Sequence, residues 1–88
     1  MVKIVHGSHF AKSVRMLPES IKTKLSKLLV ILERDPFHPL LHTKNLSGQI
    51  AGFMSFRITR DWRVIFRFLE PDSIQLIEAA HRRDIYKK

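Results

Sequence analysis

Three arginines and one histidine carry the chemistry that this sequence offers most clearly. Residues 55–66, SFRITRDWRVIF, include Arg57, Arg60 and Arg63, and His81 closes a later apolar stretch. A guanidinium group can donate two parallel hydrogen bonds to a phosphate, and an imidazole can hold or release a proton near neutral pH. Cleavage of RNA by its own 2′-OH needs a base, an acid and fixed cations around the phosphorus atom. These residue types therefore predict phosphodiester chemistry.

Two sets of residues are candidates for this chemistry. The predicted catalytic residues are Arg57, Arg63, His81 and Tyr86. The predicted RNA-binding residues are His42, Lys44, Arg60, Trp62, Arg67, Arg82 and Arg83. Each has a structural alternative, because outward arginines protect sheet edges and a tryptophan can simply cover one end of a core. The combination, rather than any single residue, supports the hypothesis.

Several other kinds of site are excluded by motif and spacing. The sequence has no glycine-rich loop after a strand, no His-Glu-x-x-His motif and no carboxylate pair suited to glycoside hydrolysis. The pairs His6/His9 and His38/His42 are each interrupted by an expected turn or a proline, so no metal site and no cofactor are expected. The absence of cysteine excludes disulfides, a thiolate nucleophile and cysteine-bound zinc.

Composition indicates one small basic domain that spans residues 1–88. Sixteen Lys and Arg against eight Asp and Glu give a formal net charge of +8, which favours a polyanionic partner such as nucleic acid. A charge that serves only solubility is the alternative. The longest apolar run, residues 28–32, is far too short to span a membrane, and no secretory signal is recognisable. We therefore expect a cytoplasmic protein with no membrane partner.

Hydrophobic periodicity predicts the element order β-α-α-β-β-β and an α+β fold. The order implies two N-terminal helices packed on a mostly antiparallel four-stranded sheet. We expect strands at 2–6, 53–58, 63–68 and 73–81 and helices at 8–17 and 18–34. Residues 35–51 contain two prolines and no sustained period, so they are expected to form a long loop, and 82–88 a short tail.

The two middle strands should form a hairpin with a basic outer face. If their apolar side chains share one face, Ile58 should lie opposite Val64, and residues 60–62 should form the loop. Arg57, Arg63 and Arg67 would then project from the face away from the core. This register predicts an open arginine platform.

Two stretches carry a family resemblance. KNLSGQIAGFMSFRITRDWRVIFRF and IEAAHRRDIY resemble the RelE/ParE toxin superfamily, especially its RelE-like and YafQ-like mRNA interferases. The resemblance implies the RelE-like microbial RNase fold and the toxin of a type II toxin-antitoxin module. Such a toxin would inhibit translation by cleaving mRNA in the ribosomal A site, without metal, to leave a 2′,3′-cyclic phosphate. It also implies a cognate RelB/DinJ-like antitoxin, acidic or partly disordered, alongside mRNA and the ribosome as partners.

The resemblance also implies roles for individual residues. His81 would be the general acid, Arg57 and Arg63 would stabilise charge on the phosphate, and Lys44 and Tyr86 would orient the RNA. Arg57 stands where relatives carry a lysine or histidine, and a guanidinium does not release its proton at physiological pH, so the general base is unassigned. Two alternatives stay open: a ParE-like inhibitor of DNA gyrase without nuclease activity, and a nucleic-acid-binding module without catalysis.

Overall fold

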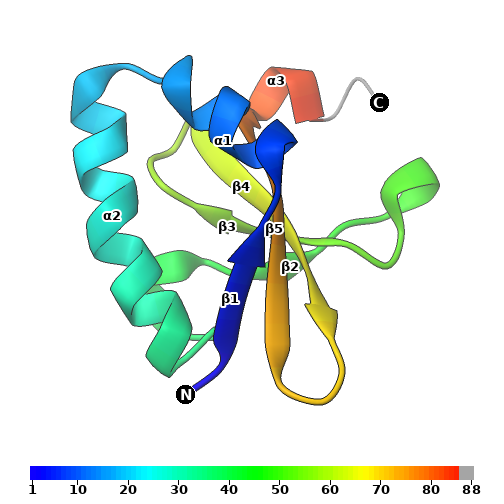
Figure 1. Ribbon diagram of the computed structural model, residues 1–88. Coiled ribbons are helices and arrows are strands. Elements are labelled where there is room, and N and C mark those ends of the chain that lie inside the picture. The colour runs from blue at the N-terminus through cyan, green and yellow to red at the C-terminus, as the bar shows by residue number, and fades with distance from the viewer. Residues whose placement is uncertain (86–88) are drawn as a thin grey trace.

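The computed structural model describes residues 1–85, so Tyr86 lies outside the described residues. In chain order the elements are β1 (Lys3–His6), α1 (Ser8–Arg15), α2 (Glu19–Arg34), η1 (Pro39–Leu41), β2 (Lys44–Asn45), η2 (Gly48–Ile50), β3 (Met54–Arg57), β4 (Trp62–Leu69), β5 (Ser73–His81) and α3 (Arg82–Ile85). Figure 1 shows α2 along one side of the sheet, with α1 and α3 near the end of β5. Within residues 1–85, every helix is too short or too polar to cross a lipid bilayer.

The sheet confirms the α+β class but has one more strand than predicted. Its order is β1-β5-β4-β3-β2, with β1 parallel to β5 and the other neighbours antiparallel. The additional strand, β2, has only two residues, Lys44 and Asn45, and both are exposed. A strand this short shows no alternation, so the predicted loop over 35–51 was wrong at this point. The same region also contains the short turns η1 and η2.

The main core lies between α2 and the sheet. The predicted stripe on α2 buries Leu25, Leu28 and Leu32, because these positions recur on one face of a helix. On the sheet side, Phe56 and Phe66 are fully buried and their rings contact each other at a centroid distance of 5.9 Å. The predicted packing of helices on one sheet face is thus confirmed.

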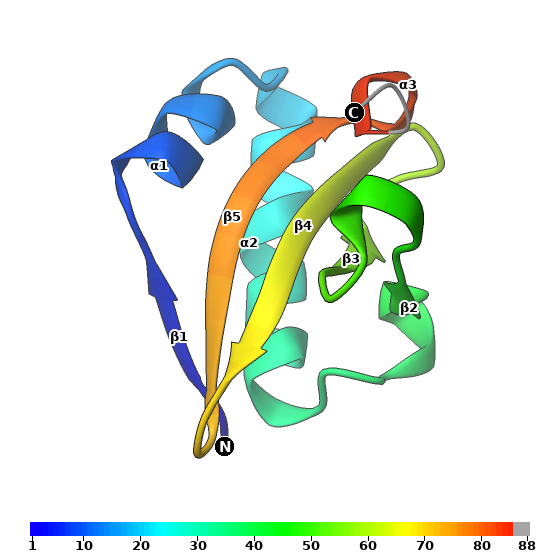
Figure 2. The same cartoon turned by 90° about the vertical axis from the view of Figure 1, so that its right-hand side faces the viewer.

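A second hydrophobic cluster covers part of the opposite face. Leu46, Ile65 and Ile85 are buried together, and Ile50 and Phe53 pack against them. Figure 2 shows α2 behind the strands and the green segment with η2 in front of them. Residues 82–85 were predicted as part of a tail, but they form α3, because a fully buried Ile85 anchors them on the sheet.

One irregularity divides β5 into two parts. Phe66 pairs with Leu76, whereas Ile65 pairs with Glu78, so Ile77 is an extra residue in the ladder between β4 and β5. Such a bulge reverses the alternation of side chains beyond it. Ile74 and Leu76 face the main core before the bulge, and Ala79 does so after it. The residues of β5 that face the main core therefore have even numbers before the bulge and odd numbers after it.

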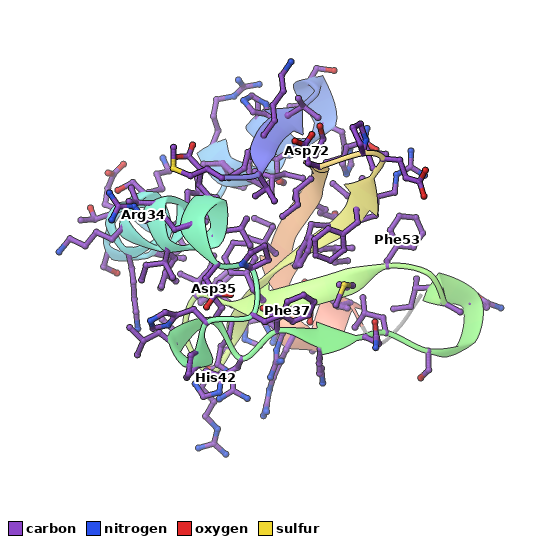
Figure 3. The ribbon with its side chains drawn as sticks, turned by 90° about the horizontal axis from the view of Figure 1, so that it is seen from below. Arg34, Asp35, Phe37, His42, Phe53 and Asp72 are labelled. Atoms are coloured by element: carbon purple, nitrogen blue, oxygen red, sulfur yellow. The ribbon has the colours of Figure 1, made fainter. Side chains whose placement is uncertain are left out.

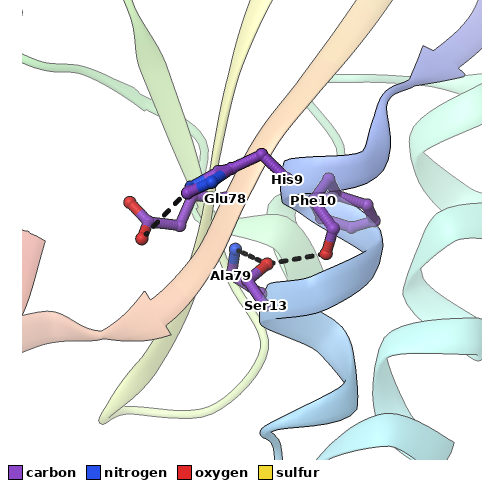
Figure 4. A network of polar contacts seen from close by, with 5 residues as sticks. All are labelled: His9, Phe10, Ser13, Glu78 and Ala79. Carbon is purple, nitrogen blue, oxygen red and sulfur yellow. Dashed lines mark hydrogen bonds and ion pairs between the residues drawn. The ribbon is translucent and has the colours of Figure 1, made fainter.

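Helix α1 closes the edge of β5 that β1 leaves unpaired. β1 pairs only with residues 73–76 of β5. Further along, the hydroxyl of Ser13 accepts a hydrogen bond from the Ala79 backbone amide at 2.9 Å and donates to the Phe10 carbonyl at 2.7 Å (Figure 4). His9 Nε2 lies 3.6 Å from a Glu78 carboxylate oxygen in the same network. These contacts join α1 to β5.

Candidate nucleic-acid interface

Arg57 and Arg63 face each other across β3 and β4. They are direct partners in the ladder, and Phe56 pairs with Val64 beside them. The predicted register was therefore wrong by two residues. The cause lies in the turn: the Trp62 carbonyl accepts hydrogen bonds from the amides of Ile58 and Thr59, which closes a longer loop over 58–61.

The two arginines lie on the sheet face away from α2, as predicted, but this face is not an open platform. Arg63 is only 6% exposed, Arg57 is half-buried and Arg67 is exposed. The predicted open platform was wrong because α3 and the segment with η2 pack on the same face through the second hydrophobic cluster. The arginine pair lies on the same face as this cluster.

Both arginines have unsatisfied hydrogen-bonding capacity. The buried Nε atoms of Arg57 and Arg63 have no hydrogen-bond partner within residues 1–85. Neither guanidinium forms an ion pair with a carboxylate in this part of the chain. Buried charged groups are normally paired, so an external anion is the natural partner of this pair. The fork geometry of guanidinium suits phosphate oxygens.

Ser55 adds a neutral polar group to the same face. It is two residues before Arg57 on β3, it is fully buried, and its Oγ has no partner among the described residues. Ser55 pairs with Lys44 of β2, whose exposed side chain therefore leaves the sheet on this face as well. The structure thus brings Lys44, Ser55, Arg57 and Arg63 onto one face.

The remaining cations predicted for RNA binding are more scattered. The guanidinium of Arg67 donates a 2.7 Å hydrogen bond from Nε to Gln75, in the other half of β4. His42 is exposed in a left-handed conformation, φ 49°, directly after η1, and Figure 3 shows it beyond this turn, at the margin of the molecule. Arg60 is exposed in the hairpin loop. These three side chains do not gather at the arginine pair.

His81 lies on the other face of the sheet from the arginine pair. It is the partner of Trp62 at the ends of β5 and β4, and the two rings meet edge to face at a centroid distance of 5.3 Å. Arg63 pairs with Ala80, one residue earlier on β5. Because neighbouring strand residues point to opposite faces, His81 and Arg63 flank the rim of the sheet from two sides.

Asp61 fixes the start of α3 at this rim. Its backbone carbonyl accepts a hydrogen bond from the Arg82 amide at 2.7 Å, and its carboxylate lies 3.6 Å from Arg82 Nε. Arg83 is exposed, and its amide donates to His81 Nδ1 at 3.3 Å. Both contacts hold the strand end and α3 together. The other nitrogen of the His81 ring forms no hydrogen bond within residues 1–85.

The arrangement can bind an anion and supply a proton at its margin. Two guanidiniums and one ammonium share a face, and an imidazole stands at the rim of the sheet on the opposite face. These are the cations and the acid that transesterification of RNA requires.

Solved structures match this chain closely in fold. No protein-family model and no curated protein matches the sequence. The structure of YafQ from E. coli strain BL21(DE3) matches with a TM-score of 0.78 and 17% identity over 98% of this chain and 99% of that chain. The toxin-antitoxin complex RelBE2 from Mycobacterium tuberculosis matches with a TM-score of 0.76 and 19% identity over 92% and 98%. The archaeal RelE-RelB complex from Pyrococcus horikoshii OT3 matches with a TM-score of 0.74 and 21% identity over 92% and 94%.

The chain has the RelE-like toxin fold. This confirms the fold implied by the sequence motifs. A fold supports several activities, so the activity has to be argued from the site.

Within the RelE-like fold, sequence reasoning missed two residues that shape the site. Ser55 gave one signal, because it occupies an outward position between the apolar Met54 and Phe56. Asp61 was expected only as part of the 60–62 loop, and its contact with Arg82 could not be seen before α3 was known. The predicted role of Tyr86 stays a prediction, since this residue follows the last described position.

Proposed function

We propose that this protein is the toxin of a toxin-antitoxin system and cleaves ribosome-bound mRNA by metal-independent transesterification. The RelE-like fold supports the general role. The single observation that carries the proposal is the arginine pair, Arg57 and Arg63, which face each other on two strands with unpartnered Nε atoms.

The arginine pair is hard to explain as a structural feature. Like charges directly opposite in a sheet destabilise it, and buried cations without partners are costly. A phosphate between the two guanidiniums would relieve both penalties with charge-assisted hydrogen bonds. A site that is unfavourable when empty and favourable with a phosphate is suited to binding RNA backbone.

The proposed reaction begins with attack of an RNA 2′-oxygen on the adjacent phosphorus atom. The P–O5′ bond breaks, and the products are a 2′,3′-cyclic phosphate and a 5′-hydroxyl end. Arg57 and Arg63 stabilise the additional negative charge on the phosphate oxygens, and Lys44 holds the neighbouring backbone. His81 donates a proton to the leaving O5′ from the rim of the sheet. The group that removes the 2′-proton is unassigned.

An acidic antitoxin segment is the proposed protein partner. The solved complexes that share this fold pair RelE-type or YafQ-type toxins with RelB-type or DinJ antitoxins. This chain carries a net charge of +8, which complements an acidic chain. We propose that such a segment covers the face with Arg57 and Arg63, in the cytoplasm where ribosomes are found.

The decisive experiment is cleavage of an mRNA positioned in the A site of purified 70S ribosomes, with cut sites mapped by primer extension. The wild type should cut at defined A-site positions. Arg63→Ala and His81→Ala should each lose at least about 100-fold in rate, which is typical for the loss of a charge-stabilising or proton-transfer group. Arg34→Ala, which removes an exposed arginine at the end of α2, should cut like the wild type.

Intact mRNA under conditions in which a control toxin cuts would overturn the ribonuclease proposal. A DNA gyrase supercoiling assay would then test the ParE-like alternative. Binding of RNA without cleavage would instead support a binding module. Unchanged cleavage by His81→Ala would reject the histidine as the acid but leave the arginine pair in place.

A further inference from the structure

A second concave site lies at the end of β5, between α1 and α3. It is an open pocket of about 750 Å³, and His9, Lys12, Arg15, Trp62, Glu78 and His81 are among its lining residues. This volume falls in the range of pockets that bind small organic ligands, about 300–1,000 Å³. Ala80, the ladder partner of Arg63, also lines it. The pocket therefore begins at β5, the strand next to Arg63 of β4.

Aromatic rings form one wall of this pocket. Trp62 and His81 meet edge to face there, and Trp62 is half-buried on the main core. Bases of single-stranded RNA commonly bind proteins by stacking on such rings. Met16, which is 84% exposed, adds an apolar lip on the α1 side.

Charged groups of both signs form the other wall. Lys12 and Arg15 lie in the last turn of α1, are exposed and form no ion pair within residues 1–85. Glu78 pairs with Ile65, so its side chain points to the sheet face of the arginine pair, opposite to Trp62; its carboxylate is 20% exposed, contacts His9 of α1 and lines the pocket from that side. Cations can hold a phosphate, and a carboxylate can accept hydrogen bonds from the amino group of a base.

We propose that this pocket binds one nucleotide of single-stranded RNA, the one on the 3′ side of the cleaved bond. Its base stacks on Trp62, its amino group donates to Glu78, and its 3′-phosphate contacts Lys12 and Arg15. The inference rests on the proposed ribonuclease function for its substrate class. The proposal also explains why His81 lies away from the arginine pair. An RNA chain that crosses the rim of the sheet between the arginine pair and the pocket would bring its O5′ atom past the His81 imidazole. The preferred bases are adenine, cytosine and guanine, which carry amino groups, over uracil.

The chain has a single tryptophan, and it lines this pocket, so its fluorescence reports on ligands bound there. The experiment titrates the full chain with the 3′,5′-bisphosphates of adenosine, cytidine, guanosine and uridine and with ribose 5-phosphate, excited above the absorbance of the bases. We expect saturable quenching by the first three, weaker binding of the uridine compound and no saturable change with ribose 5-phosphate.

Matched charge variants separate the pocket from the general charge of the protein. Lys12→Gln/Arg15→Gln removes two pocket cations, and the loss of even one charged contact should weaken binding about tenfold. Lys24→Gln/Lys27→Gln removes two exposed lysines on α2 and should bind like the wild type. Glu78→Gln should reduce the preference for amino-bearing bases over uracil.

Each outcome decides one part of the proposal. No saturable quenching, equal weakening by both double variants or equal binding of ribose 5-phosphate would overturn the pocket. A short single-stranded RNA should bind more tightly than any mononucleotide, and the reverse order would assign the pocket to a free nucleotide instead. Ribosomal cleavage by a wild type that shows no quenching rejects the pocket alone. Quenching without cleavage rejects the ribonuclease function and retains nucleotide binding.

Discussion

At the scale of single residues, Arg57 and Arg63 are proposed to serve RNA cleavage at a cost in folding stability. Two like charges opposite each other cost the folded state on the order of 0.2–1 kcal/mol, the usual size of a cross-strand pair. Arg57→Met keeps an apolar stem and removes one charge. We therefore expect the free energy of unfolding in urea to rise by up to about 1 kcal/mol, while the proposed A-site cleavage is lost.

Arg67→Met is the control for this change. Arg67 lies on the neighbouring strand β4, is exposed and hydrogen-bonds to Gln75, so its loss should not stabilise the protein. If Arg57→Met lowers the free energy of unfolding as much as Arg67→Met does, the arginine pair is not strained. Added salt should also stabilise the wild type more than Arg57→Met, because ions screen the repulsion.

Two serines with opposite surroundings give a second prediction. Ser13 satisfies the Ala79 amide at the open edge of β5, whereas the buried Ser55 hydroxyl has no partner within residues 1–85. Ser13→Ala leaves a backbone amide unpaired and should cost about 1–3 kcal/mol of unfolding free energy. Ser55→Ala should be neutral or stabilising. Urea unfolding measures both, and an equal loss in the two variants would contradict the assignment of these hydrogen bonds.

At the scale of elements, α3 depends on one anchor. Ile85 is fully buried between Leu46 and Ile65, although it ends a helix of only four residues. Ile85→Ala should loosen α3 from the sheet and raise hydrogen exchange in residues 82–85, as measured by mass spectrometry. It should also increase modification of Arg63 by an arginine-specific reagent, because α3 helps to cover this face.

Ile50→Ala provides the comparison for α3. Ile50 packs against the same cluster from η2 and is only partly buried. It should leave exchange in α3 close to that of the wild type. Equal exchange in the two variants would show that the cluster, and not Ile85, holds α3 in place.

The elements also show what the sequence can reveal. α2 and the apolar faces of β3 and β4 were predictable, because many positions repeat one period. β2, α3 and the bulge at Ile77 were not, since each depends on a few contacts between distant segments. The residue types of the site were recognisable, because arginines such as Arg57 and Arg63 suggest phosphate binding by themselves. Their position opposite each other was not, because it depends on the turn that the Trp62 carbonyl closes.

At the scale of the whole molecule, the excess of positive charge is spread over both sides of the sheet. Lys24 and Lys27 are exposed on α2, while the exposed Lys44 and the half-buried Arg57 lie on the face of the proposed site. Each phosphate neutralised in single-stranded nucleic acid contributes about 0.7 to the slope of log affinity against log salt concentration. Lys44→Gln/Arg57→Gln should therefore reduce this slope by about 1.4, measured by anisotropy of a labelled RNA.

Lys24→Gln/Lys27→Gln should leave the salt dependence nearly unchanged, because α2 lies on the other side of the sheet from the arginine pair. Equal reductions in both double variants would mean that the RNA responds to net charge and not to a defined surface.

The extra residue in β5 has a consequence for how this chain is compared with its relatives. Because Ile77 has no partner of its own in the ladder, a relative that lacks one residue here keeps every strand pair on both sides. A one-residue gap in an alignment therefore belongs at Ile77. If the gap is moved past His81 toward the C-terminus, the alignment matches His81 to the neighbouring position of the relative's strand. Because neighbouring strand positions point to opposite faces, the histidine is then placed on the wrong side of the sheet. Such an error would reassign the proposed proton donor to another position.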